Sequence, residues 1–198
     1  MERVCSNFPT PDLSTIHRRL KYELKNDKTA GNMLIMDSTG FRLMRRKKWI
    51  KLHIITDGKK IVRFVITKNS VGDSPAFRET FRTLKKELKD VDIVIGDSAY
   101  DSRDNFNIIS QYGIKPLIKV RKNSSTLSKG SLSRRAAVRE QRDANWSRNS
   151  GYTKRWLVES VFSSMKISFG ESLSSRKFNY AEREMIIIVS LFNLFHSL

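Results

Sequence analysis

The feature that most constrains the fold of this chain is the order of its short apolar runs. Five runs of strand-like composition lie at residues 32–36, 49–55, 60–66, 91–95 and 114–118. The second and third are separated by Thr56-Asp57-Gly58-Lys59, and an Asp-Gly pair between two such runs is a strong hairpin signal. Helical patterns separate the later runs, which is typical of α/β proteins. The order therefore predicts an α/β fold with a mixed five-stranded sheet flanked by helices.

Capping residues indicate where the helices begin. Asp73 or Ser74 can cap a helix whose first turn holds Pro75. Asp101-Ser102 can cap another helix, which Gly113 closes. The last two helices are expected at about residues 152–169 and 181–196. The final one is apolar on nearly all sides, so we predict that it lies in the core.

The charge of the chain restricts its function. It has 38 Lys and Arg against 20 Asp and Glu, a formal net charge of +18 over 198 residues. Such an excess favours a polyanionic partner, of which nucleic acid fits best. The longest apolar run, Met185–Phe195, is shorter than the roughly 20 residues that a membrane helix needs. With one cysteine and no signal peptide at the N-terminus, the chain is expected to be cytoplasmic and nucleoid-associated, with no membrane partner.

Two segments concentrate the positive charge. The first holds Arg42, Arg45, Arg46, Lys47, Lys48 and Lys51, and we predict that it is a turn facing DNA. The second is a basic loop at about residues 119–150, which begins with Lys119, Arg121 and Lys122 and is expected to be mobile until an anion orders it. Trp146 in this loop is a candidate for stacking on a base, whereas Trp49 and His53 are expected to be structural core residues.

Two aspartates follow apolar runs. We predict that Asp37 ends the first strand and Asp97 the fourth, and each begins a turn of small residues. Sites in open α/β sheets assemble at strand ends, so both are candidate site residues. The alternative is that each is only a turn or cap residue, which is also the interpretation of Asp57 and Asp73.

The helix expected to begin at Tyr152 supplies a third acid. At 100° per residue, Tyr152, Arg155, Glu159 and Lys166 share an arc of about 60°. This face presents an acid, two bases and a phenol, although a solvated face with an Arg155–Glu159 pair is an alternative. Three carboxylates on separate elements can hold two Mg²⁺ ions, which suit phosphoryl transfer, while Arg155 and Lys166 contact phosphates.

These residues resemble a known family. The spacing Tyr152-x2-Arg155-x3-Glu159-x6-Lys166 is similar to the signature of insertion-sequence DDE transposases, of the fourth and fifth insertion-sequence family type. The segments Met36-Asp37-Ser38-Thr39 and Gly96-Asp97-Ser98-Ala99-Tyr100-Asp101-Ser102 resemble the sequences around the two aspartates of that family. Asn69-Ser70-Val71-Gly72-Asp73-Ser74 resembles the segment before its first core helix. The resemblance covers about residues 32–198.

The resemblance implies a ribonuclease H-like fold whose first three strands are antiparallel. It implies that Asp37, Asp97 and Glu159 are the catalytic and metal-binding residues, with two Mg²⁺ ions for which Mn²⁺ can substitute. The implied activity is nicking at transposon ends, followed by attack of the freed 3′-hydroxyl on target DNA. Double-stranded DNA is the implied partner, with a homodimer formed on it, and Tyr152 contacts DNA and is not a nucleophile.

The chain departs from the family at its N-terminus, where only 36 residues precede Asp37. We therefore expect an N-terminally truncated transposase, with residues 1–31 a helical remnant that can bind DNA and residues 32–198 the catalytic domain. Two alternatives stay open. One is a catalytically silent truncated transposase that only binds DNA, and the other is a ribonuclease H-like nuclease without strand transfer.

Overall fold

The computed structural model describes residues 32–44, 48–84, 87–127 and 129–196. The expected N-terminal helical remnant lies outside these residues. The elements are β1 (Met33–Leu43), β2 (Trp49–Thr56), β3 (Ile61–Lys68), α2 (Asp73–Arg82), β4 (Ile93–Gly96), η1 (Ser98–Tyr100), α3 (Arg103–Ser110), β5 (Lys115–Ile118), α4 (Leu132–Glu140), α5 (Trp146–Asn149), η2 (Tyr152–Arg155), α6 (Trp156–Phe169), β6 (Ser172–Leu173) and α7 (Phe178–Phe195). No helix in this part of the chain is long and apolar enough to cross a bilayer.

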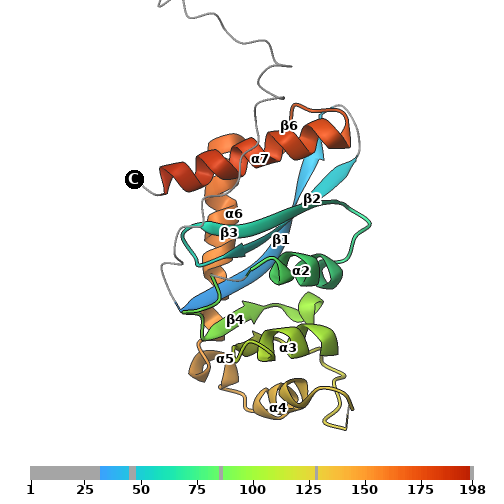
Figure 1. Cartoon of the computed structure of the whole chain (residues 1–198), viewed down its shortest axis with the longest axis vertical. Coiled ribbons are helices and arrows are strands. Elements are labelled where there is room, and N and C mark those ends of the chain that lie inside the picture. The colour runs from blue at the N-terminus through green and yellow to red at the C-terminus, as the bar shows by residue number, and fades with distance from the viewer. Residues whose placement is uncertain (1–31, 45–47, 85–86, 128, 197–198) are drawn as a thin grey trace, which may run out of the picture.

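The sheet has the order β3-β2-β1-β4-β5 (Figure 1). The first three strands pair with one another in antiparallel fashion, whereas β4 runs parallel to both β1 and β5. This confirms the predicted mixed sheet and its five strands. A sixth strand that we did not predict, the two-residue β6, pairs with the end of β1.

Helices cover both faces of the sheet (Figure 1). On β1, Ile35 packs in a core with α6 and α7, whereas Leu34 and Met36 pack in a second core with α2 and α3. The division follows from the alternation of side chains along a strand. Helix α7 contributes Met185 and Val189 to the first core, as its apolar sequence predicts. The result is a three-layered α/β/α arrangement, in which each side of β1 meets a different set of helices.

Strand β1 does not end where the sequence indicates. We expected Asp37 to close the strand and begin a turn, but β1 continues for six more residues to Leu43. The reason is the antiparallel ladder with β2, which pairs Asp37 with Ile54 and still pairs Arg42 with Trp49. Backbone hydrogen bonds to a neighbouring strand outweigh the low strand preference of Ser38 and Gly40. Asp37 is therefore a mid-strand residue, and the turn interpretation is wrong.

The basic segment 119–150 also differs from expectation, because it contains helices α4 and α5. Ser131 caps α4 by accepting a hydrogen bond from the Arg134 amide. Ala137 and Val138 form the buried face of this helix. Gln141 then ties the segment to the sheet, since its amide donates to the Ile118 carbonyl at 2.7 Å. Local capping and a small apolar face thus order a region whose composition predicts a loop.

A buried carboxylate anchors this segment. Asp101 accepts from Arg134 Nε at 2.6 Å and Nη2 at 2.9 Å, and from the Arg121 amide at 3.0 Å. The Asp101 side chain is fully buried. Burial acts to raise the pKa of Asp101, but the hydrogen bonds from Arg134 and Arg121 outweigh it and lower this pKa. Asp101 comes four residues after Asp97, so it connects the basic segment to the end of β4.

Two helix starts differ in detail. Gly72 is the N-cap of α2, and Asp73 lies in its first turn and makes no cap hydrogen bond, so the expected cap is wrong. The helix expected from Tyr152 begins as the short 3₁₀ helix η2, and α6 starts at Trp156.

We predict that Asp101→Asn lowers the free energy of unfolding by about 3 kcal/mol, because it leaves the Arg134 guanidinium without its buried counter-charge. Urea unfolding followed by circular dichroism measures this. The matched control is Glu140→Gln, which removes a carboxylate 3.5 Å from Lys115 in a pair that is about half exposed. The control should cost less than about 1 kcal/mol. Equal effects of the two variants would contradict the anchoring role.

Candidate active site

Parallel pairing of β1 and β4 places two aspartates side by side. The register pairs Ile35 with Ile95, so Asp37 and Asp97 each lie two residues beyond a paired position. Neighbouring strands lie about 4.8 Å apart, which makes the two carboxylates cross-strand neighbours. Ile35 and Ile95, which come two residues before the two aspartates, pack in the core with α6 and α7. Because side chains alternate along a strand, both aspartates lie on that face of the sheet. Asp97 also caps η1 by accepting from the Ala99 amide at 2.8 Å.

Asp37 is a partly buried acid with an unusual proton affinity. Burial raises its pKa to about 6, and the nearby charge of Asp97 adds to this effect. The Ser38 amide, which donates to Oδ1 at 2.8 Å, and the Arg155 guanidinium act in the opposite direction. The raised pKa shows that the hydrogen bonds and the cation around Asp37 do not fully balance its charge. Such a carboxylate gains from a further cation.

Arg155 joins the third acid to the first. Its Nη1 donates to Oδ2 of Asp37 at 3.1 Å, and its Nη2 donates to Oε1 of Glu159, one turn further along. The guanidinium therefore lies between a carboxylate of the sheet and a carboxylate of α6. The expected Arg155–Glu159 pair is present, but it is not a solvated pair on an isolated helix face, because Asp37 shares the same cation. Glu159 itself is largely exposed at 57% of its side chain.

The donor set suits a hard divalent cation, although the conformation does not assemble it. Asp37, Asp97 and Glu159 offer only carboxylate oxygens, the ligand type that Mg²⁺ prefers. Among the described residues, no group of three or more His, Cys, Asp or Glu side chains is close enough to hold one ion. The geometry thus brings two carboxylates together and keeps the third linked through Arg155. The residues fit a metal centre in their chemistry, provided that Arg155 releases Asp37 and Glu159.

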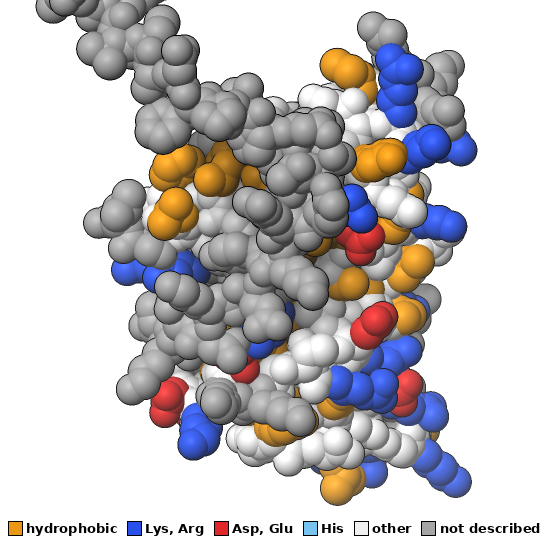
Figure 2. Space-filling view, turned by 45° about the horizontal axis from the view of Figure 1, so that its top comes forward, with side chains coloured by type: hydrophobic (Ala, Val, Ile, Leu, Met, Phe, Trp, Pro, Cys, Tyr) orange, Lys and Arg blue, Asp and Glu red, His pale blue; other side chains and the backbone are white. Residues whose placement is uncertain are grey.

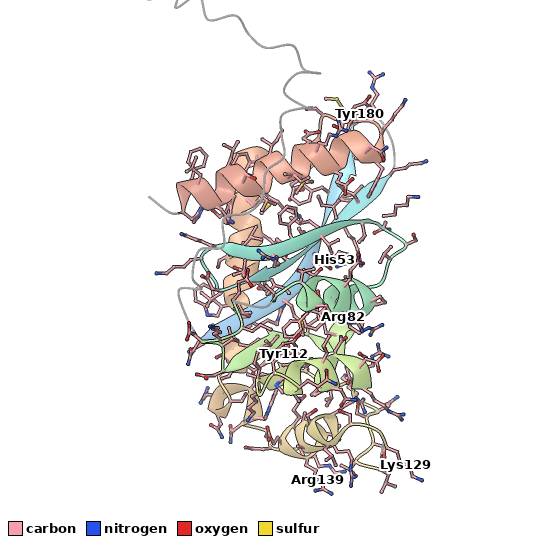
Figure 3. All side chains as sticks on the ribbon, viewed as in Figure 1. His53, Arg82, Tyr112, Lys129, Arg139 and Tyr180 are labelled. Atoms are coloured by element: carbon pink, nitrogen blue, oxygen red, sulfur yellow. The ribbon has the colours of Figure 1, made fainter. Side chains whose placement is uncertain are left out.

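The opposite face of β1 carries a polar cluster that sequence reasoning missed. Asp73 accepts from the Ser38 hydroxyl at 2.6 Å and from Lys51 Nζ at 3.1 Å. The buried His53, labelled in Figure 3, places Nδ1 3.4 Å from the same oxygen. The contacts with His53, Ser38 and Lys51 hold the pKa of Asp73 well below its usual value. The cluster fixes the β1 backbone directly behind Asp37, and the only signal for it in the sequence was the polar residues at alternate positions of β2.

Tyr100 is a buried phenol whose ionisation is opposed by the charges of the acids. Its ring is buried against Phe77 of α2. Burial raises its pKa well above the usual value, and the charges of Asp37, Asp73 and Asp97 raise it further.

Four predicted DNA contacts line one hollow. Lys119, Arg121, Lys122 and Tyr152 border a cavity of about 550 Å³ together with Trp146. Tyr152 is buried, and its ring packs on the Trp146 indole with centroids 4.9 Å apart. Burial raises the pKa of Tyr152 to about 12. A phenol that keeps its proton at neutral pH is a poor nucleophile, and its buried position differs from the exposed face that the helical wheel indicated.

Lys166 lies further along α6. Its Nζ is 5.7 Å from the centre of the Phe41 ring and 3.8 Å from Glu171. Lys166 and Glu159 line the same shallow hollow of about 400 Å³. The remaining predicted DNA contacts, Arg45, Arg46 and Lys47, lie outside the described residues.

The fold and the site define a class of α/β protein that places carboxylates on the central strands of a mixed sheet, beside cationic side chains suited to phosphate. The chain matches the model of the transposase DDE domain family over residues 29–194 and therefore belongs to that family. This confirms the resemblance to DDE transposases seen in the sequence.

A solved structure supports the fold. The chain is similar to the cryo-EM structure of a piggyBac transposase synaptic complex with hairpin DNA, with a TM-score of 0.56 at 11% sequence identity. The likeness covers 85% of this chain and 47% of that one, so this chain spans about half the length of that protein. At this identity the likeness concerns the fold alone, which is ribonuclease H-like, as the sequence predicted.

We predict that Asp37→Asn becomes more stable relative to wild type as the pH rises from 4 to 7. The folded-state pKa of Asp37 lies above its unfolded value, so ionisation in this window costs the wild type stability and the variant none. The difference in unfolding free energy should shift by on the order of 2 kcal/mol. Urea unfolding at several pH values measures it, with the exposed Asp90→Asn as control. A difference that stays constant with pH would contradict the buried state of this carboxylate.

Proposed function

We propose that this chain is a DNA transposase that catalyses metal-dependent cleavage at transposon ends and strand transfer into target DNA. The observation that carries the proposal is the register that sets Asp37 beside Asp97, with Arg155 linking Asp37 to Glu159. The family membership supports it. The finer assignment to the fourth or fifth insertion-sequence type rests on the spacing of Tyr152, Arg155, Glu159 and Lys166.

Asp37, Asp97 and Glu159 are the residues that would hold Mg²⁺ or Mn²⁺. A pair of such ions, when bound, stabilises the attacking and leaving oxygens of an in-line phosphoryl displacement. The protein's own contribution begins with Arg155, whose fork of donors matches a phosphate as well as it matches a carboxylate. A DNA phosphate that takes over this fork frees Asp37 and Glu159 for the metal.

The cationic side chains place the DNA. Lys119, Arg121 and Lys122 surround the hollow that Trp146 and Tyr152 line, which is a suitable surface for a phosphate backbone. Lys166 extends this contact along α6, and Arg45, Arg46 and Lys47 are proposed as further DNA contacts from the sequence alone. Double-stranded DNA is the proposed partner, bound by a homodimer at two transposon ends, in the nucleoid.

A catalytically silent DNA-binding protein is the second candidate. One observation favours it: Arg155 lies between two of the three acids, and a site that stays closed in this way binds phosphate without cleaving it.

Nicking of supercoiled plasmid in Mg²⁺ or Mn²⁺ tests the proposal. We expect Asp97→Asn and Glu159→Gln each to lower the nicking rate roughly 100-fold or more, because a metal ligand supplies several kcal/mol to the transition state. Asp90→Asn and Glu182→Gln, two exposed acids elsewhere on the chain, are the matched controls and should nick as wild type does. Binding without any nicking by wild type would support the silent binder. Nicking that survives both site variants would reject the assignment of these acids.

Replacement of Arg155 tests its double role. We expect Arg155→Gln to bind Mn²⁺ several-fold more tightly in the absence of DNA, because a competing cation has gone. The same variant should bind DNA more weakly. Isothermal titration with Mn²⁺ and anisotropy with a labelled duplex measure the two effects. If Mn²⁺ affinity stays the same or falls, Arg155 does not hold the acids back from the metal.

A further inference from the structure

A second cationic surface lies at the far end of the sheet from the acids. A groove of about 580 Å³ runs between the ends of β1, β2 and β3 and the beginning of α7. Its cations are Lys48, Lys68, Arg176 and Lys177. All four side chains are exposed, and none of its described lining residues is acidic. Figure 2 shows Lys and Arg side chains gathered at its upper right, over this end of the molecule.

Within the part of the chain that the structure describes, these cations have no acidic partner. None of the four takes part in an ion pair among those that the described residues form. This differs from Lys51 and Arg155, which are each paired with an aspartate. Four like charges around one concave surface repel each other, so the arrangement favours an anion that spans the groove.

The groove also exposes an aromatic ring. Trp49 was expected in the core, but it is 47% exposed, because it lies at the start of β2. Its ring lies over Gly40, where an added Cβ would approach Trp49 Cε3 to 3.1 Å. The glycine therefore leaves room for the ring, which a Cβ at this position would crowd. An exposed ring beside cations suits a sugar-phosphate backbone, whose sugars offer apolar contact and whose phosphates offer charge.

The position of the groove relative to the acids sets the geometry of the ligand. Leu43, which lines the groove, lies six residues beyond Asp37 on the same strand. At 3.3 Å per residue this separates the two places by about 20 Å. That distance corresponds to about six base pairs of duplex DNA at 3.4 Å per pair.

We propose that this groove binds the backbone of the same DNA duplex about six base pairs from the position cleaved at the acids. The proposal rests on the proposed function in naming the duplex. It adds Lys68, Arg176, Lys177 and Trp49 to the DNA-contacting residues. Lys68, Arg176 and Lys177 belong neither to the signature nor to the predicted basic turn, and Trp49 lies within that turn but is not one of the six cations that define it.

Binding measured without catalysis tests the groove independently of cleavage. Anisotropy of a labelled 20-base-pair duplex is recorded in EDTA over a range of salt concentrations, for wild type and for Lys68→Ala/Lys177→Ala. We expect roughly tenfold weaker binding or more, and a slope of log affinity against log salt that is smaller by about 2, since each phosphate contact contributes about 0.9. The matched control is Lys59→Ala/Lys89→Ala, which removes the same charge from two exposed lysines elsewhere. The control should weaken binding less than twofold.

The outcomes separate the groove from the active site. Equal losses in the two double variants would overturn the proposal, because only total charge would then matter. An unchanged affinity in the groove variant would overturn it as well. If the groove variant binds DNA as expected while wild type never nicks plasmid, the DNA contact at the groove is supported and the proposed transposase activity is contradicted. Circular dichroism melts of both variants check that each is folded.

Discussion

The parallel pairing of β1 with β4 is the constraint on which the candidate site depends. It sets Asp37 of β1 beside Asp97, the residue that follows β4, each two residues beyond the last paired position, on the face that α6 covers. Burial of the Asp37 carboxylate is costly, and the nearby charge of Asp97 adds to the cost, which is why the pKa of Asp37 rises to about 6. The antiparallel ladder between β1 and β2, which extends from Ile35 to Arg42, holds the strand in place and offsets this local cost.

The cations and polar groups around β1 follow from that cost. On one face, Arg155 divides its guanidinium between Asp37 and Glu159. On the other face, Asp73 draws Ser38, Lys51 and His53 into a cluster that fixes the strand from behind. Asp37 thus lies between the Arg155 guanidinium on one face of β1 and the Asp73 cluster on the other. This combination suits a site in which a phosphate displaces the cation while the strand stays still.

Much of this arrangement could be predicted from the sequence. The apolar runs and the Asp-Gly turn indicated the strands, and the family signature pointed to Asp37, Asp97 and Glu159. The failures have one kind of cause. Asp37 was placed at a strand end because Ser38 and Gly40 are weak strand formers, and the segment 119–150 was predicted to be a loop because it is rich in Ser and Lys. In the first case pairing with β2 overrode local preference, and in the second the Ser131 cap, the buried Ala137 and Val138 and the tie from Gln141 to Ile118 together outweighed the composition.

The sequence by itself determined the succession of strands along the chain, the hairpin of β2 and β3, the alternation that divides the two cores, and the residue types available for phosphate and metal chemistry, because these depend on local periodicity and composition. Only the tertiary structure decided that Arg155 would bridge Asp37 and Glu159, that Asp101 would anchor the basic helices, and that Trp49 would face solvent beside Lys68. These are contacts between residues far apart in the chain. Their energies depend on burial and on distance in space, and neither is encoded in any short stretch of sequence.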